Sequence, residues 1–79
     1  MAELERLLLV LARSLVEDPD AVEVSGTETE TRVDLELRVA PEDMGKIIGR
    51  QGRTIRAVRT VVKAASVKLG KRVSVEVPG

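Results

Sequence analysis

The first seventeen residues carry a helical pattern, because their hydrophobic positions recur every three or four residues. A helix is predicted over residues 2–17, and the segment Asp18-Pro19-Asp20 ends it, since proline lacks an amide hydrogen and disfavours helical backbone before it. Leu9 and Val10 fall on the other side of this helix, where they either pack at the flank of the core or form a patch for a second chain. The apolar face itself comprises Leu4, Leu7, Leu8, Leu11 and Leu15.

Two segments then alternate with a period of two, which is typical of strands with one buried and one wet face. Val22 and Val24 alternate with polar residues as far as Gly26, and residues 33–39 alternate strictly between aliphatic and charged side chains. An antiparallel pair is therefore expected. The polar stretch 27–31 either extends one of these strands or forms a loose connection.

The rest of the chain predicts two helices and a strand. Pro41 suits the first turn of a short helix, which is interrupted by Gly49 and Gly52. A longer helix is expected over residues 53–69, with Gly70 as its left-handed cap. Residues 71–77 alternate again and predict a last strand. The apolar set of the short helix is Met44, Ile47 and Ile48, and that of the longer helix is Ile55, Val58, Val61, Val62, Ala65 and Leu69.

The resulting order, α-β-β-α-α-β, predicts an α+β fold: a three-stranded mixed sheet with helices on one face. The helical connection between the second and third strands makes parallel pairing of these two strands possible. With 79 residues, the chain has room for one small domain, and we expect residues 1–79 to form it.

Composition narrows the function. The chain has no Cys, His, Phe, Trp or Tyr, which excludes disulfides, thiolate or imidazole metal sites and His- or Cys-based nucleophilic catalysis. Glu42 and Asp43 could bind magnesium or act as an acid–base pair, but acidic residues are expected at a helix start for electrostatic reasons alone. We therefore predict that the protein is not an enzyme and needs no cofactor.

Charge is divided unevenly along the chain. Thirteen basic and thirteen acidic residues balance overall, yet residues 1–43 carry a net charge of −8 and residues 44–79 a net charge of +8. Such asymmetry favours a face that binds a polyanion, although a dipolar soluble surface is the alternative. The hydrophobic run at residues 7–12 is too short to span a bilayer and follows acidic residues, unlike a secretory signal, so a cytoplasmic location is expected.

The segment from Lys46 to Ile55 carries the candidate chemistry. Two glycines that bracket Arg50 and Gln51 make a tight turn whose backbone can approach a ligand closely. The free amides and positive dipole end of the following helix point at this turn, which suits phosphate oxygens. Basic side chains surround it and continue as one stripe along the helix: Lys46, Arg50, Arg53, Arg56, Arg59 and Lys63. A plain helix–helix turn with a solvated basic face is the alternative.

The run Ile47-Ile48-Gly49-Arg50-Gln51-Gly52-Arg53-Thr54-Ile55 resembles the I-G-x-x-G-x-x-I signature of KH domains, and the order of elements matches their type II, prokaryotic arrangement. A free-standing domain of this length is most similar to the KhpA family of bacterial RNA-binding proteins. The resemblance covers nearly the whole chain.

This resemblance implies that Gly49, Arg50, Gln51 and Gly52 clamp the backbone of about four single-stranded nucleotides. It implies a groove for the bases that is floored by aliphatic side chains, for which Ile48 and Ile55 are candidates, whereas Met44 or Ile47 could equally be core. The residues predicted to bind RNA are Lys46, Ile48, Gly49, Arg50, Gln51, Gly52, Arg53, Ile55 and Arg56.

The resemblance also implies an RNA chaperone or post-transcriptional regulator that is linked to cell elongation and wall homeostasis. Its partner would be a second copy or a larger KhpB/EloR (Jag)-like protein. The alternative is a dimerising adaptor on a KH scaffold that binds nucleic acid only incidentally.

Overall fold

A computed structural model describes residues 2–78 and shows six main elements. These are α1 (Ala2–Leu15), β1 (Glu23–Glu28), β2 (Arg32–Arg38), α2 (Met44–Ile48), α3 (Arg53–Ala65) and β3 (Arg72–Glu76). Short 3-10 turns lie at Pro19–Ala21, Pro41–Asp43, Arg50–Gly52 and Val67–Leu69. The predicted order α-β-β-α-α-β is confirmed.

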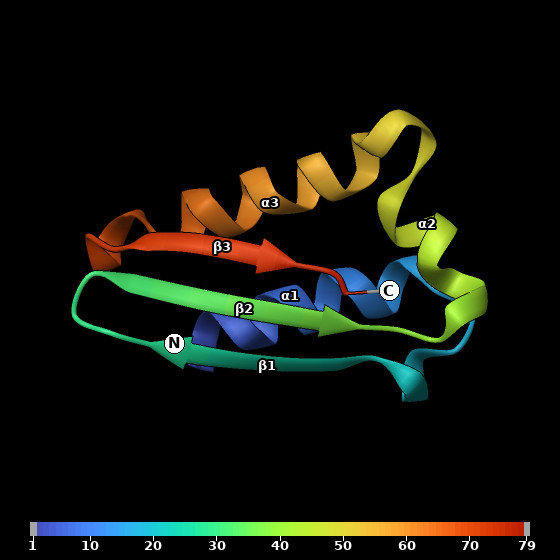
Figure 1. Cartoon of the computed structure of the whole chain (residues 1–79), viewed down its shortest axis with the longest axis horizontal. Helices are drawn as coiled ribbons and strands as arrows, with labels where there is room; N and C mark the ends of the chain where they lie inside the picture. Colours follow the sequence, from blue (N-terminus) through green and yellow to red (C-terminus); the bar gives the residue numbers. More distant parts are fainter. Residues whose placement is uncertain (1, 79) are drawn as a thin grey trace.

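The three strands form one sheet in the order β1-β2-β3, as Figure 1 shows. β1 and β2 are antiparallel, with Val24 opposite Leu37, and β2 and β3 are parallel, with Leu35 opposite Val75. The predicted mixed sheet is confirmed, and β3 is one of its edges. The parallel pairing is possible because α2 and α3 carry the chain back to the starting end of β2.

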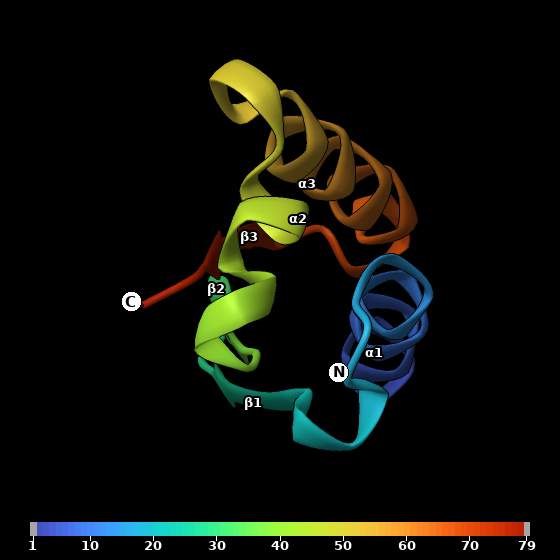
Figure 2. The ribbon, with the colours of Figure 1, turned by 90° about the vertical axis from the view of Figure 1, so that its right-hand side faces the viewer.

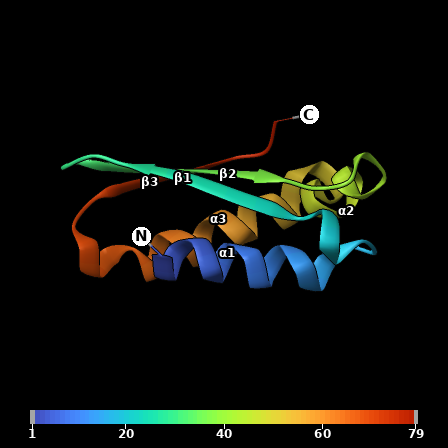
Figure 3. The same ribbon diagram turned by 90° about the horizontal axis from the view of Figure 1, so that it is seen from below.

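The helices α1 and α3 lie side by side under one face of the sheet, and α2 lies across its end (Figures 2 and 3). The core between them is aliphatic, and its largest fully buried side chains are Leu8, Val33, Leu35, Leu37, Ile47 and Val62. Alternate residues of β2 enter this core. The opposite sheet face carries the charged residues, as the period-two pattern predicts.

Both long helices end earlier than their hydrophobic patterns predict. α3 ends at Ala65 because Ser66 donates from its hydroxyl to Lys63 O (2.7 Å) and the last turn tightens into the 3-10 turn Val67–Leu69. Consequently Leu69 stays exposed, and so does Val61 on the flank of α3. α1 ends at Leu15, which is also exposed. Ala65, the last residue of α3, is exposed too. These four residues are therefore not the core residues that the pattern predicts.

The polar stretch 27–31 does both: Thr27 and Glu28 extend β1, which ends at Glu28, and residues 29–31 form the connection. Thr29 then closes the connection, because its hydroxyl accepts hydrogen bonds from the N–H groups of Thr31 (3.3 Å) and Arg32 (3.0 Å).

Leu9 and Val10, the two apolar residues on the other side of α1, differ in burial. Leu9 is half-buried and packs against the core, whereas Val10 is exposed. Flank packing is therefore confirmed for Leu9, and Val10 remains on the surface. Among residues 2–78, no helix reaches the length and apolar content that crossing a membrane would need.

Candidate nucleic-acid interface

The bend between α2 and α3 is the centre of the candidate site. Gly49 ends α2 by donating its N–H to Gly45 O at 2.8 Å and turns the chain with φ 74° and ψ 172°. Gln51 (φ 56°) and Gly52 (φ 72°) also have left-handed backbone before α3 begins at Arg53. Three positive φ values within four residues make a sharp turn that no continuous helix could provide.

Gly49 cannot carry a side chain in this arrangement. A β-carbon there would lie 2.1 Å from Thr54 Oγ1 and 2.9 Å from the Thr54 backbone nitrogen. The bend therefore packs directly on the first turn of α3. Thr54 has this structural role although the sequence analysis does not single it out, because the contact depends on how tightly the chain turns.

The two residues between the glycines point their polar groups outward. Arg50 and Gln51 are both exposed. Arg56, one turn into α3, donates from Nη2 to Gln51 O at 3.0 Å, which ties the loop to the helix. No acidic residue occurs between Met44 and Val75 in the sequence, so every charge that this segment contributes is positive.

The start of α3 adds backbone donors to the bend. Gly52 is the residue before the helix, and within the described chain no side chain hydrogen-bonds to the first-turn N–H groups. These groups and the helix dipole favour an anion at this position. Together with Arg50 and Arg53, both exposed, they give the bend donors and positive charges at the same place.

The basic stripe on α3 follows the predicted spacing. Arg53, Arg56 and Lys63 are exposed. Arg59 is half-buried, because its Nε reaches across to β3 and donates to Val75 O at 3.0 Å. Helical spacing places Arg59 on this stripe but does not reveal its contact, which joins residues sixteen positions apart.

Lys46 is turned toward acidic residues. Its Nζ lies 3.1 Å from Glu17 Oε1 and 3.7 Å from Asp43 Oδ1, and the hydrogen bond to Glu17 raises its pKa. Asp43 is buried and accepts hydrogen bonds from the backbone N–H groups of Glu17 (3.2 Å) and Asp18 (3.1 Å). This carboxylate thus links the end of α1 to the start of α2. No group of three or more potential ligands within residues 2–78 could hold a metal ion.

The two isoleucines expected to floor a groove differ in exposure. Ile48 is half-buried. Ile55 is only 5% exposed and belongs to the core cluster, so it differs from the expectation that it lines a base-binding surface. The reason is rotational: Ile55 shares the inward face of α3 with Val58 and Val62, whereas the stripe occupies the outward face.

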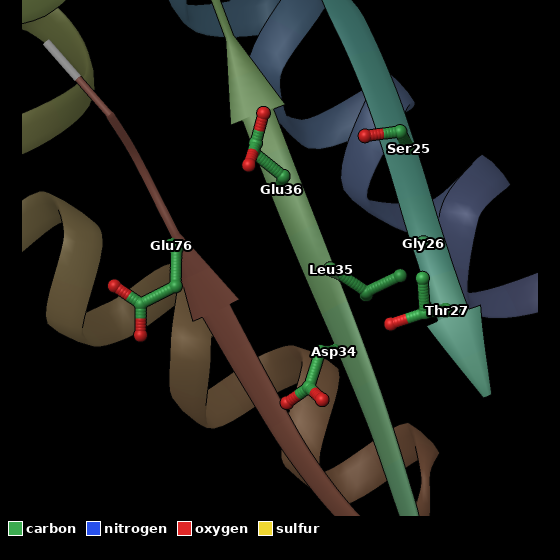
Figure 4. Close-up of a pocket in the computed structure, with 7 residues that line it drawn as sticks. All are labelled: Ser25, Gly26, Thr27, Asp34, Leu35, Glu36 and Glu76. Carbon is green, nitrogen blue, oxygen red and sulfur yellow. The ribbon is translucent and has the colours of Figure 1, made fainter. Parts of the chain in front are cut away.

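The open face of the sheet has the opposite character. A shallow hollow there is lined by Ser25, Gly26, Thr27, Asp34, Leu35, Glu36 and Glu76, and Figure 4 shows its three carboxylate side chains on β2 and β3. Two of these carboxylates are paired with basic side chains, Asp34 with Arg32 and Glu36 with Arg38. This face therefore carries mixed charge and suits a nucleic-acid backbone less than the bend does. The candidate interface is confined to the side of the molecule that carries the bend and α3.

Comparison with known proteins agrees with this geometry. Residues 5–77 match the family model described as the KhpA/KhpB KH domain. The chain is 57% identical over 74 residues to an RNA-binding protein KhpA from Clostridium acetobutylicum, with 94% of this chain and 99% of that protein covered. A protein of the same name from Aquifex aeolicus is 44% identical over 77 residues, with 98% of both chains covered.

A solved structure shares the fold at low sequence identity. It is the crystal structure of Era in complex with MgGDPNP and nucleotides 1506–1542 of 16S ribosomal RNA. The match has a TM-score of 0.70 at 19% identity and covers 94% of this chain but 28% of the Era chain. The α-β-β-α-α-β order with a mixed sheet is therefore the type II KH fold. The family model and the near full-length relatives together show that the chain belongs to the KhpA/KhpB family of KH domains.

Proposed function

We propose that this protein binds single-stranded RNA and grips the RNA backbone with the bend Gly49–Gly52. The observation that carries the proposal is the bend itself, a turn held open by three positive φ values that presents Arg50 and Gln51 at the start of α3. Main-chain N–H groups, a helix N-terminus and guanidinium groups are complementary to phosphate oxygens. KH domains use such a loop to clamp about four nucleotides.

The relatives support this assignment, because the proteins from Clostridium acetobutylicum and Aquifex aeolicus are each named as RNA-binding proteins. Those names describe no enzyme, in agreement with the prediction from composition. In the proposed complex, Arg50, Arg53 and Arg56 contact phosphates, and Ile48 supplies apolar contact to a base. Affinity will fall steeply with salt, since each neutralised phosphate releases counterions.

The test is a double substitution in the loop, Arg50→Asp with Gln51→Asp. Both side chains are exposed, so we expect an unchanged circular dichroism spectrum and loss of detectable binding to single-stranded RNA. A control with the same charge change lies at the other end of α3: Val67→Asp with Lys68→Asp, both also exposed. Retained affinity in the loop variant, or equal loss in both variants, would contradict the assigned loop.

A dimerising adaptor is the second candidate, and one observation favours it. An apolar hollow lies between α1 and α3, lined by Leu11, Ser14, Leu15, Thr54, Ala57, Val58 and Val61. Leu15 and Val61 are exposed there. A second copy or a KhpB-like protein would bury this surface. The RNA chaperone or post-transcriptional regulator role and the link to cell elongation and wall homeostasis belong to the RNA-binding proposal above, not to the adaptor.

Sedimentation equilibrium tests the adaptor function. Val61→Glu should convert a dimer to a monomer, whereas Val67→Glu, at a position that is 76% exposed, should leave the mass unchanged. A wild-type protein that sediments as a monomer, or a Val61→Glu variant that remains a dimer, would argue against self-association through this hollow.

A further inference from the structure

The contact between Arg59 and β3 affects which bases the protein can recognise in a bound RNA. β3 is the edge strand of the sheet, and Arg72 directs its N–H toward β2, to Thr31 O at 3.0 Å. Because the backbone groups of successive residues in a strand point alternately to its two sides, those of Val73 and Val75 face the open edge. An open edge offers N–H donors and C=O acceptors to any hydrogen-bonding partner.

Arg59 changes what this edge offers. Its Nε donates to Val75 O, so this carbonyl already has a donor in the free protein. Arginine carries five N–H groups and no acceptor, and four of them remain. Val75 itself is only 2% exposed, whereas Arg59 is half-buried. At this point of the edge, an incoming ligand therefore meets the remaining guanidinium N–H groups of Arg59, all of which are donors.

This donor-rich position lies beside the proposed path of the RNA. Arg59 is six residues after Arg53, which is about 9 Å along the axis of α3. Arg59 therefore lies between the phosphate-binding bend and the edge of β3, on the side of the molecule where α3 and β3 run next to each other (Figure 1). A strand of about four nucleotides held by its phosphates at the bend brings a base to this position.

Bases differ in how their acceptors are arranged. Cytosine has two adjacent acceptors, O2 and N3, and guanine has O6 and N7, which arginine pairs with in a bidentate manner. Adenine places its N6 amino donor next to N1 and N7, and the N3–H donor of uracil separates O2 from O4. Two parallel donors therefore match cytosine and guanine and mismatch adenine and uracil.

We propose that Arg59, by occupying Val75 O, makes this protein prefer cytosine or guanine over adenine and uracil at one nucleotide position. This inference rests on the proposed RNA-binding function and adds base selection to it. Removal of the guanidinium frees the Val75 carbonyl, so that the edge offers one donor and one acceptor, the pattern that adenine complements.

The experiment measures the anisotropy of fluorescein-labelled octamers rC8, rA8 and rU8, and of an alternating uridine–guanosine octamer, with the wild type and three variants. The wild type should bind rC8 at least about fivefold more tightly than rA8, since one bidentate pair discriminates by this factor or more. The same preference should favour the octamer that contains guanosine over rU8. In Arg59→Ala, the ratio of the rC8 and rA8 affinities should fall below about two.

Two further variants separate base selection from charge. Arg59→Lys keeps the positive charge but has no planar pair of donors, so its ratio should also fall while the salt dependence stays near that of the wild type. Lys63→Ala removes a cation one turn further along the exposed stripe, so it should weaken rC8 and rA8 equally. If Arg59→Ala disturbs the circular dichroism spectrum, the affinity ratio of Arg59→Lys is the result that tests the inference.

Three results overturn the inference. A wild type that binds rA8 as tightly as rC8, or a ratio that survives in both Arg59 variants, removes Arg59 as the determinant while leaving the RNA-binding function intact. A ratio that falls equally in Lys63→Ala assigns the preference to charge in general. Absence of binding to all four octamers overturns the proposed function and this inference with it.

Discussion

A glycine with a positive φ lies near each end of α3, Gly52 before it and Gly70 after it. The surroundings of the two ends differ. At the N-terminal end, Gly49 packs against Thr54, Gln51 has a positive φ, and Arg56 ties the loop to the helix. At the C-terminal end, Gly70 (φ 64°) closes an ordinary turn, where an added β-carbon would meet no described atom within 4 Å. The backbone at the N-terminal end is held by specific contacts, whereas the turn at the C-terminal end only has to reverse the direction of the chain.

The charges at the two ends differ in the same way. Arg50 and Arg53 are exposed beside the bend, in a segment without acidic residues. Near Gly70, Lys71 is paired with Glu28 and Arg32 with Asp34. Basic residues alone therefore do not mark the interface. What distinguishes it is exposed positive charge beside a tight turn in which Gly49 packs directly on Thr54.

The largest expected effect comes from Gly49→Ala. Gly49 lies in a region of backbone space that is essentially reserved for glycine, and the new methyl group would overlap Thr54. We expect a loss of about 3 kcal/mol in the free energy of unfolding, or at least about 12 °C in melting temperature for a domain of this size, together with loss of RNA binding.

Gly70→Ala is the matched substitution for the other end. It should cost about 1 kcal/mol, because only the left-handed backbone is penalised, and it should leave RNA affinity unchanged. Thermal denaturation monitored by circular dichroism measures both variants. Equal destabilisation by the two would show that the contact with Thr54 adds nothing.

An intermediate effect is expected from Arg56→Gln. This change removes one phosphate contact and the hydrogen bond to Gln51 O, so the slope of log affinity against log salt should decrease in magnitude by about one. Lys68→Gln, in the turn at the other end, should leave the slope unaltered. Binding titrations at several salt concentrations make the comparison, and equal slopes for the two variants would contradict the assignment of Arg56.

The smallest expected effect is on the pH dependence of stability near Gly70, where Lys71 is paired with Glu28. The hydrogen bond from Lys71 lowers the pKa of Glu28. A carboxylate with a lowered pKa stabilises the fold above its ordinary pKa, and this contribution is lost as the pH falls through the lowered value. Glu28→Gln should therefore lose less stability on acidification than the wild type does. Urea denaturation between neutral and acidic pH gives the difference, which a parallel pair of curves would contradict.

Much of the fold could be predicted from periodicity, because each pattern reports a local face. The alternation of residues 33–39 identified β2, and the glycines at 49 and 52 located the break between α2 and α3. The end of α3 could not be predicted, since Ser66 competes for the backbone carbonyls of the last turn. Hydrophobic spacing continues to Leu69 without showing this competition.

The residues of the candidate site likewise divide into those whose positions the sequence predicts and those whose positions it does not. Arg50, Gln51, Gly52, Arg53 and Arg56 lie together around the bend, and the spacing alone placed them there. Lys46, in contrast, is drawn to Glu17 and Asp43, and Ile55 enters the core. Both outcomes depend on neighbours that are distant in the chain or on the rotation of α3 against the sheet.

The sequence alone determined the order of elements, the bend and the division of charge. Each of these depends on residues that are only a few positions apart in the chain. The packing of Thr54 beneath Gly49, the burial of Ile55 and the bond from Arg59 to Val75 were decided only by the tertiary structure. Each of these needs two segments at one place at the right angle, and that placement results from the whole core closing around the sheet.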